Sequence, residues 1–468
     1  MRILLTTYFS LPTFTGLNTY INVLKAELEE HGHQVDVLAH HPSMEQTVYL
    51  VNGGATIDKT EIRNVVYGET ERYFKQHWPN VDPWVLNAEM GRYTFELAAS
   101  LLRLHQYDLI HAQDVISARA MRRVKPEQVP LVATIHGIYT KELLYYGWIT
   151  DQESLQWKYM AEQERLGVVS PYCALVPTKW MKNEFRNVFR IPERRLKISP
   201  YGINVEQFLR RMKAEPDSSI EPPPGTFVMA CVARIDPIKG HKTLMEALSL
   251  LKEKQDHFVC WLIGGCYQKE LQAELEKERL TRKLENHVIF LGDRADVPAL
   301  LHRADIMILP SLQENHPFAI MEAHLAGTAV VASDAGGIPE MIRHEENGLL
   351  FEKQNAAQLA DKLLTIMNRP KLRLRMEAAA RARGIKRWSS DSLYRRIMQV
   401  YDQARASVQP AQPNAVKASV WPASLFLFET DRSWDTGPWP AILRHLPAGY
   451  SIPDIQFMKW LAAKEGND

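Results

Sequence analysis

Two glutamates separated by seven residues, Glu314 and Glu322, lie where the chain is expected to pass from a strand into a helix. Glu314 falls in the expected loop and Glu322 near the start of the expected helix, so both carboxylates can point into one crevice. A carboxylate only accepts hydrogen bonds, and a pair of them suits a ligand rich in hydroxyl groups. For Glu322 alone, an ordinary favourable interaction with the helix dipole is a serious alternative.

Arg234 and Lys239 lie five residues apart, around a turn that follows a predicted strand. Such a pair can converge on a diphosphate, because arginine offers a planar fork of donors and lysine a compact charge. Two solvated surface cations would show the same spacing, and without further context this is the more frequent case. The chain has neither a Gly-x-x-x-x-Gly-Lys-Ser/Thr loop nor a Gly-x-Gly-x-x-Gly motif, which argues against a dinucleotide-dependent dehydrogenase.

Gly16 and His136 are further candidates, each just after or at the end of a predicted strand. Gly16 precedes a helix expected from about Asn18. The unpaired N–H groups of a helix start favour a phosphate there, and a glycine allows close approach to the backbone. His136, followed by Gly137, closes the run LVATIH and is expected to face the crevice. A simple turn and a structural histidine are the alternatives for these two positions.

Short apolar runs alternate with helical patterns along most of the chain, and these elements must position the candidates. The runs are rich in Val, Ile and Leu, as in parallel strands buried on both faces. Strands are predicted in a first series at 2–6, 35–39, 109–112, 131–136, 174–177 and 197–199, and in a second series at 226–233, 258–264, 287–291, 306–310 and 329–333. The alternation predicts doubly wound α/β domains, which bind ligands beyond the carboxyl ends of their strands.

The two series of strands predict two domains, which we place at 1–205 and 206–387. A third region, 408–468, has a different composition, with seven of the 27 prolines and four of the 11 tryptophans. Disordered tails are poor in aromatic residues, so we expect this extension to be packed rather than free. Its apolar stretch VWPASLFLF is expected to lie on the protein body, on a partner or on a membrane surface.

Composition narrows the class of protein. Apolar residues make up 46% of the 468 residues and charged residues 24%, as in soluble globular proteins. Lys and Arg number 56 against 55 Asp and Glu, so no nucleic-acid partner is expected. The four cysteines fit neither a disulfide framework nor a zinc site, which indicates a reducing compartment. With no apolar run typical of a signal peptide or a membrane span, a cytoplasmic location is expected.

Taken together, the motifs resemble those of glycosyltransferase family 4. The resemblance covers roughly residues 1–405, and its most specific part is the block PSLQENHPFAIMEAHLAGTAVVASDAGGIPE around the two glutamates. The other matching elements are the Gly16 loop, IHG at 135–137, SPYGINVEQF at 199–208, RIDPIKGH at 234–241, FLGDR at 290–294 and ENGLLF at 346–351. The resemblance implies the GT-B architecture, two facing Rossmann-like domains with a crevice between them. It also implies that a helix at about 388–405 crosses back to the first domain.

The resemblance further implies roles for the candidate residues of the second domain. It places Arg234 and Lys239 on the diphosphate of a nucleotide-sugar donor, Glu322 on the ribose and Glu314 on hydroxyl groups of the transferred sugar. Retention of the anomeric configuration without a protein nucleophile is implied, with the leaving phosphate helping to accept the proton of the acceptor. No metal or other cofactor is expected, because the two cations can stabilise the departing diphosphate. The chain also has no Asp-x-Asp metal signature.

Four more residues take roles from the same resemblance. His136 would line the sugar site from the first domain, and the Gly16 loop would approach the distal phosphate. Arg294 and Phe318 are further donor-binding candidates. The sequence departs from the family pattern at Leu17, where a second glycine is usual, and after Glu314, where Asn-His-Pro replaces the common Gly-Phe-Gly.

We therefore expect a retaining transferase that moves a sugar from a nucleotide-diphosphate donor to a sugar, lipid-linked or small-molecule acceptor. Polysaccharide, glycolipid or cell-envelope glycan synthesis is the expected setting. The alternatives are a GT-B epimerase or phosphorylase and a catalytically silent nucleotide- or sugar-binding partner of another transferase. Aromatic and basic residues in 67–105, and basic stretches at 179–197 and 371–387, suggest peripheral contact with an anionic membrane. Solvated helix faces would explain the same residues.

Overall fold

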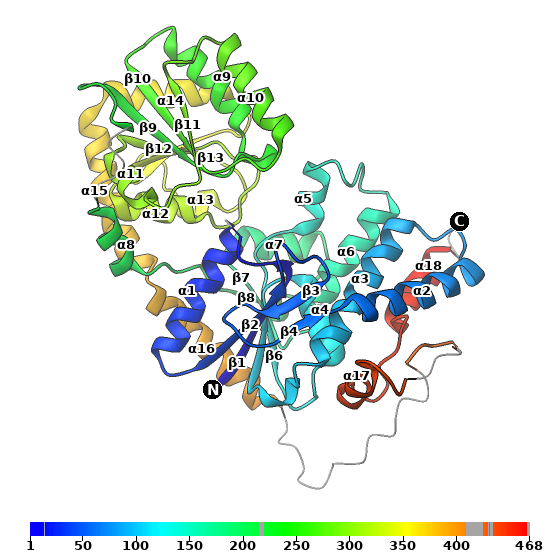
Figure 1. Ribbon diagram of the computed structural model, residues 1–468. Helices are drawn as coiled ribbons and strands as arrows, with labels where there is room; N and C mark the ends of the chain where they lie inside the picture. Colours follow the sequence, from blue (N-terminus) through cyan, green and yellow to red (C-terminus); the bar gives the residue numbers. More distant parts are fainter. Residues whose placement is uncertain (14, 215–219, 409–424, 429, 431–433, 466–468) are drawn as a thin grey trace. The chain divides into compact units, whose positions relative to one another are not determined.

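The computed structural model describes residues 1–13, 15–214, 220–408, 425–428, 430 and 434–465. The chain forms two compact units (Figure 1). The first unit comprises Met1–Val176, Glu184–Lys197 and Arg396–Asp468, and the second comprises Pro177–Asn183 and Ile198–Arg395. The main body of the second unit thus begins before the expected boundary at residue 206. The chain returns to the first unit within the helix expected at about 388–405.

Within the described residues, the first unit is built on eight strands in the order β4-β3-β2-β1-β5-β6-β7-β8. These strands are β1 (Arg2–Ser10), β2 (Gln34–His40), β3 (Thr47–Leu50), β4 (Thr56–Asp58), β5 (Leu109–Ala112), β6 (Leu131–Thr134), β7 (Ala174–Val176) and β8 (Leu196–Ile198). Strands β2, β1, β5, β6 and β7 pair in parallel, whereas β3 and β4 run antiparallel at one edge.

Helices follow most of these strands. They are α1 (Gly16–Glu30), α2 (Thr60–His77), α3 (Pro83–Ser100), α4 (Val115–Val124), α5 (Tyr139–Tyr145), α6 (Leu155–Val169), α7 (Lys179–Asn187), α16 (Ser390–Ala406), α17 (Trp439–His445) and α18 (Ile455–Glu465), with short 3-10 turns η1 (Leu104–Gln106) and η2 (Glu193–Arg195). Helices α7 and α16 each have residues in both units.

The second unit contains a parallel sheet in the order β11-β10-β9-β12-β13-β14. Its strands are β9 (Phe227–Val232), β10 (Phe258–Ile263), β11 (Val288–Gly292), β12 (Ile306–Leu309), β13 (Ala329–Ser333) and β14 (Gly348–Phe351). Its helices are α8 (Val205–Met212), η4 (Pro237–Lys239), α9 (His241–Lys252), α10 (Lys269–Thr281), α11 (Val297–Arg303), α12 (Phe318–Ala326), α13 (Ile338–Met341), α14 (Ala356–Asn368) and α15 (Pro370–Arg387).

The two sheets confirm the predicted α/β class with two Rossmann-like domains. Every strand predicted from an apolar run is present, with its ends displaced by a few residues at most. Three strands were not predicted: the short antiparallel pair β3 and β4, and β14. Strands β3 and β14 are mostly buried but, at four residues each, lack the continuous Val/Ile/Leu run of a central parallel strand, and β4 is a partly exposed strand of three residues.

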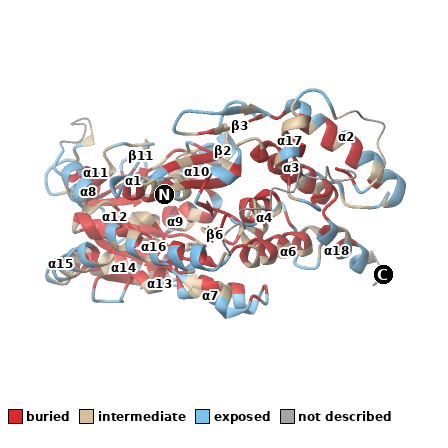
Figure 2. Ribbon diagram, turned by 90° about the horizontal axis from the view of Figure 1, so that it is seen from below, coloured by how far each residue is buried: buried red, intermediate tan, exposed pale blue. Residues whose placement is uncertain are grey.

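Helix α1 shows how the local sequence sets these elements. The Thr15 hydroxyl accepts a hydrogen bond from the backbone N–H of Asn18 (3.4 Å) and caps the helix. Tyr20, Leu24 and Leu28 then recur at the helical period and are buried, while the other face is exposed. Figure 2 shows the same division on other helices, with buried residues concentrated along the strands and on one side of each surface helix.

The described part of the C-terminal extension packs on the first unit. The N–H of Leu427 donates to the carbonyl of Ile452 (2.8 Å), and the ring of Phe428 stacks on Tyr73 of α2 with centroids 4.4 Å apart. The indole of Trp439 donates to Glu61 of α2 (2.9 Å). Of the three surfaces considered for the extension, its described residues therefore lie on the protein body. Residues 420–424 of the apolar stretch lie outside the described part.

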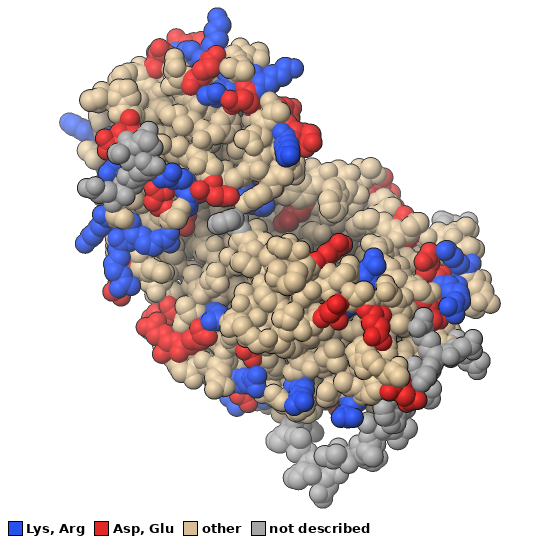
Figure 3. All heavy atoms as spheres, viewed as in Figure 1, with Lys and Arg blue, Asp and Glu red and all other residues tan. Residues whose placement is uncertain are grey.

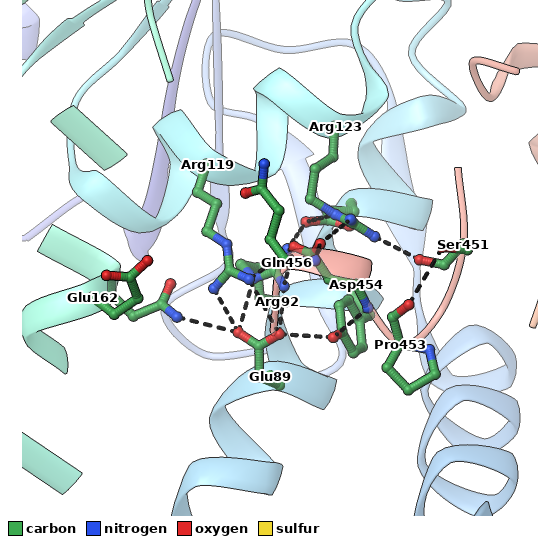
Figure 4. A network of polar contacts seen from close by, with 12 residues as sticks. Glu89, Arg92, Arg119, Arg123, Glu162, Ser451, Pro453, Asp454 and Gln456 are labelled. Atoms are coloured by element: carbon green, nitrogen blue, oxygen red, sulfur yellow. Dashed lines mark hydrogen bonds and ion pairs between the residues drawn. The ribbon is translucent and has the colours of Figure 1, made fainter. Parts of the chain in front are cut away.

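A buried ion cluster joins the extension to helices α3 and α4 (Figure 4). Its members are three arginines and three carboxylates: Arg92, Arg119, Arg123, Glu89, Glu96 and Asp454. Asp454 comes from the extension and pairs with Arg119 at 2.8 Å and Arg123 at 3.1 Å. The nearby arginines hold the pKa of Asp454 well below its usual range, despite its burial. Three positive charges are thus matched by three negative ones.

The packing of the extension corrects part of the expectation that aromatic and basic residues in 67–105 could face a membrane. Arg92 and Phe74, which we counted among residues that could face a membrane, are each only 1% exposed. Arg92 forms ion pairs within the buried cluster, and Phe74 lies next to Phe457 of the extension. Figure 3 shows basic and acidic side chains interspersed over the face that it presents. Across the described residues, no helix is both long and apolar enough to span a bilayer.

Candidate active site

The loop after β9 presents both predicted phosphate-binding cations. Arg234 lies two residues after the end of the strand, and its guanidinium lies 3.8 Å from Asp236. Asp236 caps the turn η4 by accepting a hydrogen bond from the N–H of Ile238 (3.1 Å). That turn ends at Lys239, so the two cations stand on one short, capped loop beyond the carboxyl end of the strand. This is the edge at which open α/β sheets bind ligands.

The loop after β12 brings Glu314 to the same place. The ammonium group of Lys239 donates to Glu314 Oε1 at 2.7 Å, and the Ser311 hydroxyl donates to the same oxygen at 2.9 Å. Both side chains of the ion pair are mostly buried, with 18% and 11% of their surface exposed. The structure therefore joins two residues that the sequence analysis placed in separate motifs. The direct contact between them was not predicted.

Two glycines allow these loops to pack so closely. Gly240 has a φ of +72°, and a Cβ there would lie 2.0 Å from the carbonyl oxygen of Pro310. Gly336 has a φ of +57°, and a Cβ there would lie 2.0 Å from the carbonyl oxygen of Glu314. Any other residue at either position would force the loop backbones apart and strain its own backbone. The position of Glu314 thus depends on backbone packing as well as on its ion pair.

Glu322 occupies a different place on its helix than expected. Helix α12 begins at Phe318, directly after Pro317, so Glu322 lies in the middle of the helix instead of near its start. Proline ends the preceding extended segment and is well suited to a helix start. The helix-dipole explanation of Glu322 therefore does not hold. Burial raises the pKa of this carboxyl to about 7, and no hydrogen bond to it is found among the described residues.

The other two predicted donor contacts of this unit have partners of their own. Arg294, after β11, forms a two-pronged ion pair with Asp296, with N–O distances of 2.8 and 2.7 Å. Phe318 stacks on Tyr201, with ring centroids 5.3 Å apart and planes inclined by 19°. Tyr201 belongs to the matched stretch SPYGINVEQF, but its stacking was not predicted. The roles of Arg294 and Phe318 at the donor stay predictions.

Gly16 and His136 belong to the first unit. Gly16 is the first residue of α1, two residues earlier than the expected helix start, because Thr15 provides the cap. His136 lies just beyond β6 and forms a hydrogen bond of 3.1 Å with Gln113, which follows the neighbouring strand β5. Burial lowers the pKa of His136 to about 3, so this imidazole is neutral at physiological pH. Gln113 was missed, because a glutamine gives no sequence signal of its own.

In each unit, candidate polar groups lie at the carboxyl edge of its own sheet. In the second unit the structure brings Arg234, Lys239 and Glu314 onto two adjoining loops. In the described part of the chain, no three His, Cys, Asp or Glu side chains gather as ligands of a metal would. A cationic loop next to acceptor carboxylates can bind a phosphate and a polyol at once.

Comparisons with known families agree with this arrangement. Residues 14–207 match the model of glycosyltransferase family 4, and residues 213–383 match the model of glycosyl transferases group 1. Together the two matches take in both units, and the chain belongs to the family 4 glycosyltransferases of the GT-B fold. The predicted resemblance is confirmed.

Individual relatives extend over most of the chain. It is 26% identical over 377 residues to a D-inositol 3-phosphate glycosyltransferase from Pseudarthrobacter chlorophenolicus, covering 79% of this chain and 86% of that protein. It is 25% identical over 423 residues to a glycogen synthase from Mycobacterium tuberculosis, covering 88% and 97%. The crystal structure of Anabaena HepE in complex with UDP-glucose has the same fold, with a TM-score of 0.62, 20% identity and coverage of 86% and 100%.

Proposed function

We propose that the chain transfers a sugar from a nucleotide-diphosphate donor to an acceptor, with retention of configuration and without a metal ion. The observation that supports this most strongly is the ion pair of Lys239 and Glu314, held at 2.7 Å at the carboxyl edge of the second sheet. One residue of the pair suits a phosphate and the other a sugar hydroxyl. Their contact therefore marks where the phosphate and the sugar of one donor molecule would meet.

In this proposal Arg234 and Lys239 bind the diphosphate, and Glu314 accepts hydrogen bonds from hydroxyl groups of the transferred sugar. Glu322, whose carboxyl forms no hydrogen bond within the described residues, binds the ribose. The bond from the anomeric carbon to the phosphate oxygen breaks, and the acceptor oxygen bonds to that carbon from the same face. The leaving diphosphate takes the acceptor proton. Two fixed cations lower the barrier by stabilising the charge that develops on this leaving group.

His136 acts in the proposal as a neutral group. Because its pKa is low, the imidazole carries no positive charge at physiological pH. In the proposal it forms a hydrogen bond with the sugar. The hydrogen bond to Gln113 holds the ring in one orientation. A neutral imidazole near the anomeric centre avoids repelling the positive charge that develops on the sugar ring.

A binding screen against UDP, GDP and ADP tests the donor assignment. UDP is the first probe, because HepE was crystallised with UDP-glucose. One nucleotide should raise the melting temperature of the protein, with about 2.7 kcal/mol of stabilisation at a hundredfold excess over its Kd. Arg234→Ala should abolish that shift. Lys242→Ala serves as the matched control, because Lys242 is an exposed cation on α9 with its own partner, Glu274.

Turnover provides a second, independent readout. With the nucleotide sugar identified by the screen, Lys239→Ala should lose orders of magnitude in kcat, because this cation acts mainly on the leaving group. Chelation of metal ions by EDTA should leave the wild-type rate unchanged. If no nucleotide stabilises the protein, or if Lys239→Ala retains the wild-type rate, the proposed donor site is wrong.

A further inference from the structure

A polar pocket lies in the first unit, beside the buried ion cluster. It has a volume of about 650 Å³, within the range of small-molecule sites. Helix α4 contributes the residues at its C-terminal end, and the segment from α6 to β7 contributes another wall. The third wall comes from the extension, through residues such as Ser451 and Gln456. The extension therefore completes this pocket when it packs on the body.

The pocket lies at the opposite edge of the sheet from His136. Leu131, the first residue of β6, lines it, whereas His136 follows the last residue of the same strand. Helix α4 connects β5 to the parallel strand β6, so its C-terminal end returns to the amino edge of the sheet. A ligand bound in this pocket would not occupy the proposed donor site.

Five cations line the pocket, against a single carboxylate. Two of them, Arg119 and Arg123, belong to the buried ion cluster, where Asp454 and the glutamates of α3 neutralise them (Figure 4). The carboxylate of the pocket is Asp454 itself, so its charge is already used. The remaining three cations are Arg122, Lys125 and Arg195. They form a separate, unbalanced positive group.

Two of these three cations donate hydrogen bonds to backbone carbonyls. The ammonium group of Lys125 donates to the carbonyl of Pro126 (3.1 Å), and the guanidinium of Arg195 donates to the carbonyl of Pro171 (3.3 Å). Arg122 is exposed at the pocket. None of the three forms a salt bridge with a carboxylate in the described part of the chain. Burial, and next the charge of Arg122, lower the pKa of Lys125 to about 8, although the nearby carboxylate of Glu127 acts in the opposite direction.

The dipole of helix α4 does not account for the gathering of Arg122, Lys125 and Arg195. Cations are common in the last turn of a helix, and α4 alone would explain Arg122 and Arg123. Arg195 comes from the turn η2, on a different part of the chain, and still lines the same pocket. Residues 409–424, which follow the pocket-lining Val408, contain one lysine and no acidic residue. That segment cannot supply the missing negative charge.

We propose that the pocket binds a ligand carrying phosphate groups, through Arg122, Lys125 and Arg195. Arginine binds phosphate oxygens with two parallel donors and lysine with a compact charge. The volume exceeds that of inorganic phosphate alone, so the ligand is an organic phosphate or the phosphate headgroup of a lipid. The site is independent of the donor site and depends on the extension for one wall.

Calorimetric titration with sodium tripolyphosphate tests this site. The titration uses the full chain with Arg234→Ala and Lys239→Ala, so that the proposed donor site does not contribute. Further replacement of Arg122 or Arg195 by alanine should weaken binding about tenfold, the loss expected for a charged hydrogen bond. Lys75→Ala is the matched control, because Lys75 is 74% exposed on α2, outside the pocket. Absence of binding, or equal affinity in all variants, would overturn the proposal.

Vesicles distinguish the two sources of the phosphate. If the ligand is a lipid headgroup, the chain should co-sediment with phosphatidylglycerol vesicles at low salt, and tripolyphosphate and Arg195→Ala should each reduce that binding. If the ligand is soluble, vesicles should not compete with tripolyphosphate. Unchanged melting of Arg122→Ala and Arg195→Ala would show that lost binding reflects the pocket and not the fold.

Discussion

At the scale of single residues, Lys239 and Glu314 neutralise each other in the absence of a donor. Each charge compensates the other, which offsets the free-energy cost of burying most of the ammonium group and most of the carboxylate. A bound diphosphate would add a second anion beside Lys239 and leave Glu314 free to accept from a sugar hydroxyl.

The sequence indicated candidate side chains but not their partners. Arg234, Lys239, Glu314 and Glu322 were proposed from motifs that resemble those of the family, and their roles at a donor stay predictions. Ser311 and other supporting residues were missed, because a side chain that positions another one carries no distinct pattern. Their roles follow only from which loops the fold brings together.

Glu164 is a supporting residue of this kind. It is fully buried on α6, and its carboxyl accepts hydrogen bonds from the N–H (3.1 Å) and hydroxyl (3.3 Å) of Thr140, near the start of α5. Its other oxygen, Oε2, has no hydrogen-bond partner among the residues that the structure describes. Burial raises the pKa of Glu164 to about 8. The protonated carboxyl of Glu164 therefore holds the segment that follows His136 in place.

A pH dependence of stability follows from Glu164. The folded protein keeps this proton up to about pH 8, whereas the unfolded chain loses it near pH 4.3. Stability from this group is complete at low pH, and it should fall by at most about 1.4 kcal/mol per pH unit between those values. Urea unfolding at pH 6 and pH 8 measures the fall. Glu164→Gln should remove it and the exposed control Glu153→Gln should not; an unchanged slope in Glu164→Gln would refute the assignment.

At the scale of elements, Asp454 ties the extension to the buried ion cluster. Asp454 begins the approach to α18 and pairs with arginines of α4, while its N–H donates to the hydroxyl of Tyr93 (2.9 Å). The sequence predicted that this region would pack, from its aromatic residues. It could not predict where, because the partners of Asp454 lie on helices far away in the chain.

Asp454→Asn should therefore destabilise the first unit. It leaves one positive charge of the buried cluster unmatched, and removing one partner of a buried ion pair costs about 3–5 kcal/mol. The melting temperature should fall, and cleavage by protease within residues 425–465 should become faster. Lys459→Ala, at an exposed position of α18, is the control for a surface change. Wild-type melting of Asp454→Asn would mean that aromatic packing alone holds the extension.

At the scale of the whole molecule, each unit has its own sheet and its own buried core. The two apolar series of the sequence predicted this division, because each sheet is built mainly from strands close in sequence. The boundary was displaced, because residues 177–183 and 198–205 belong to the second unit although they precede its first strand. Connecting segments carry no periodic signal that assigns them to either side.

Two units with separate cores should unfold in separable steps. In scanning calorimetry, the nucleotide that binds in the screen should raise one transition, that of the second unit. Asp454→Asn should lower the other. The two perturbations act on different units, so their effects should add. Equal shifts of a single transition under both perturbations would show instead that the chain unfolds as one cooperative body.

The ion cluster also delays the folding of the first unit during synthesis of the chain. Arg119 and Asp454 are 335 residues apart, so at about 5–20 residues per second a ribosome adds Asp454 roughly 17–67 s after Arg119. During that interval the nascent first unit holds three arginines against two glutamates at the same buried place. Its strands can pair early, but helices α3 and α4 reach a neutral interior only once Asp454 has been added. The arrival of Asp454, and not the emergence of the first sheet, therefore sets when this ion cluster can form.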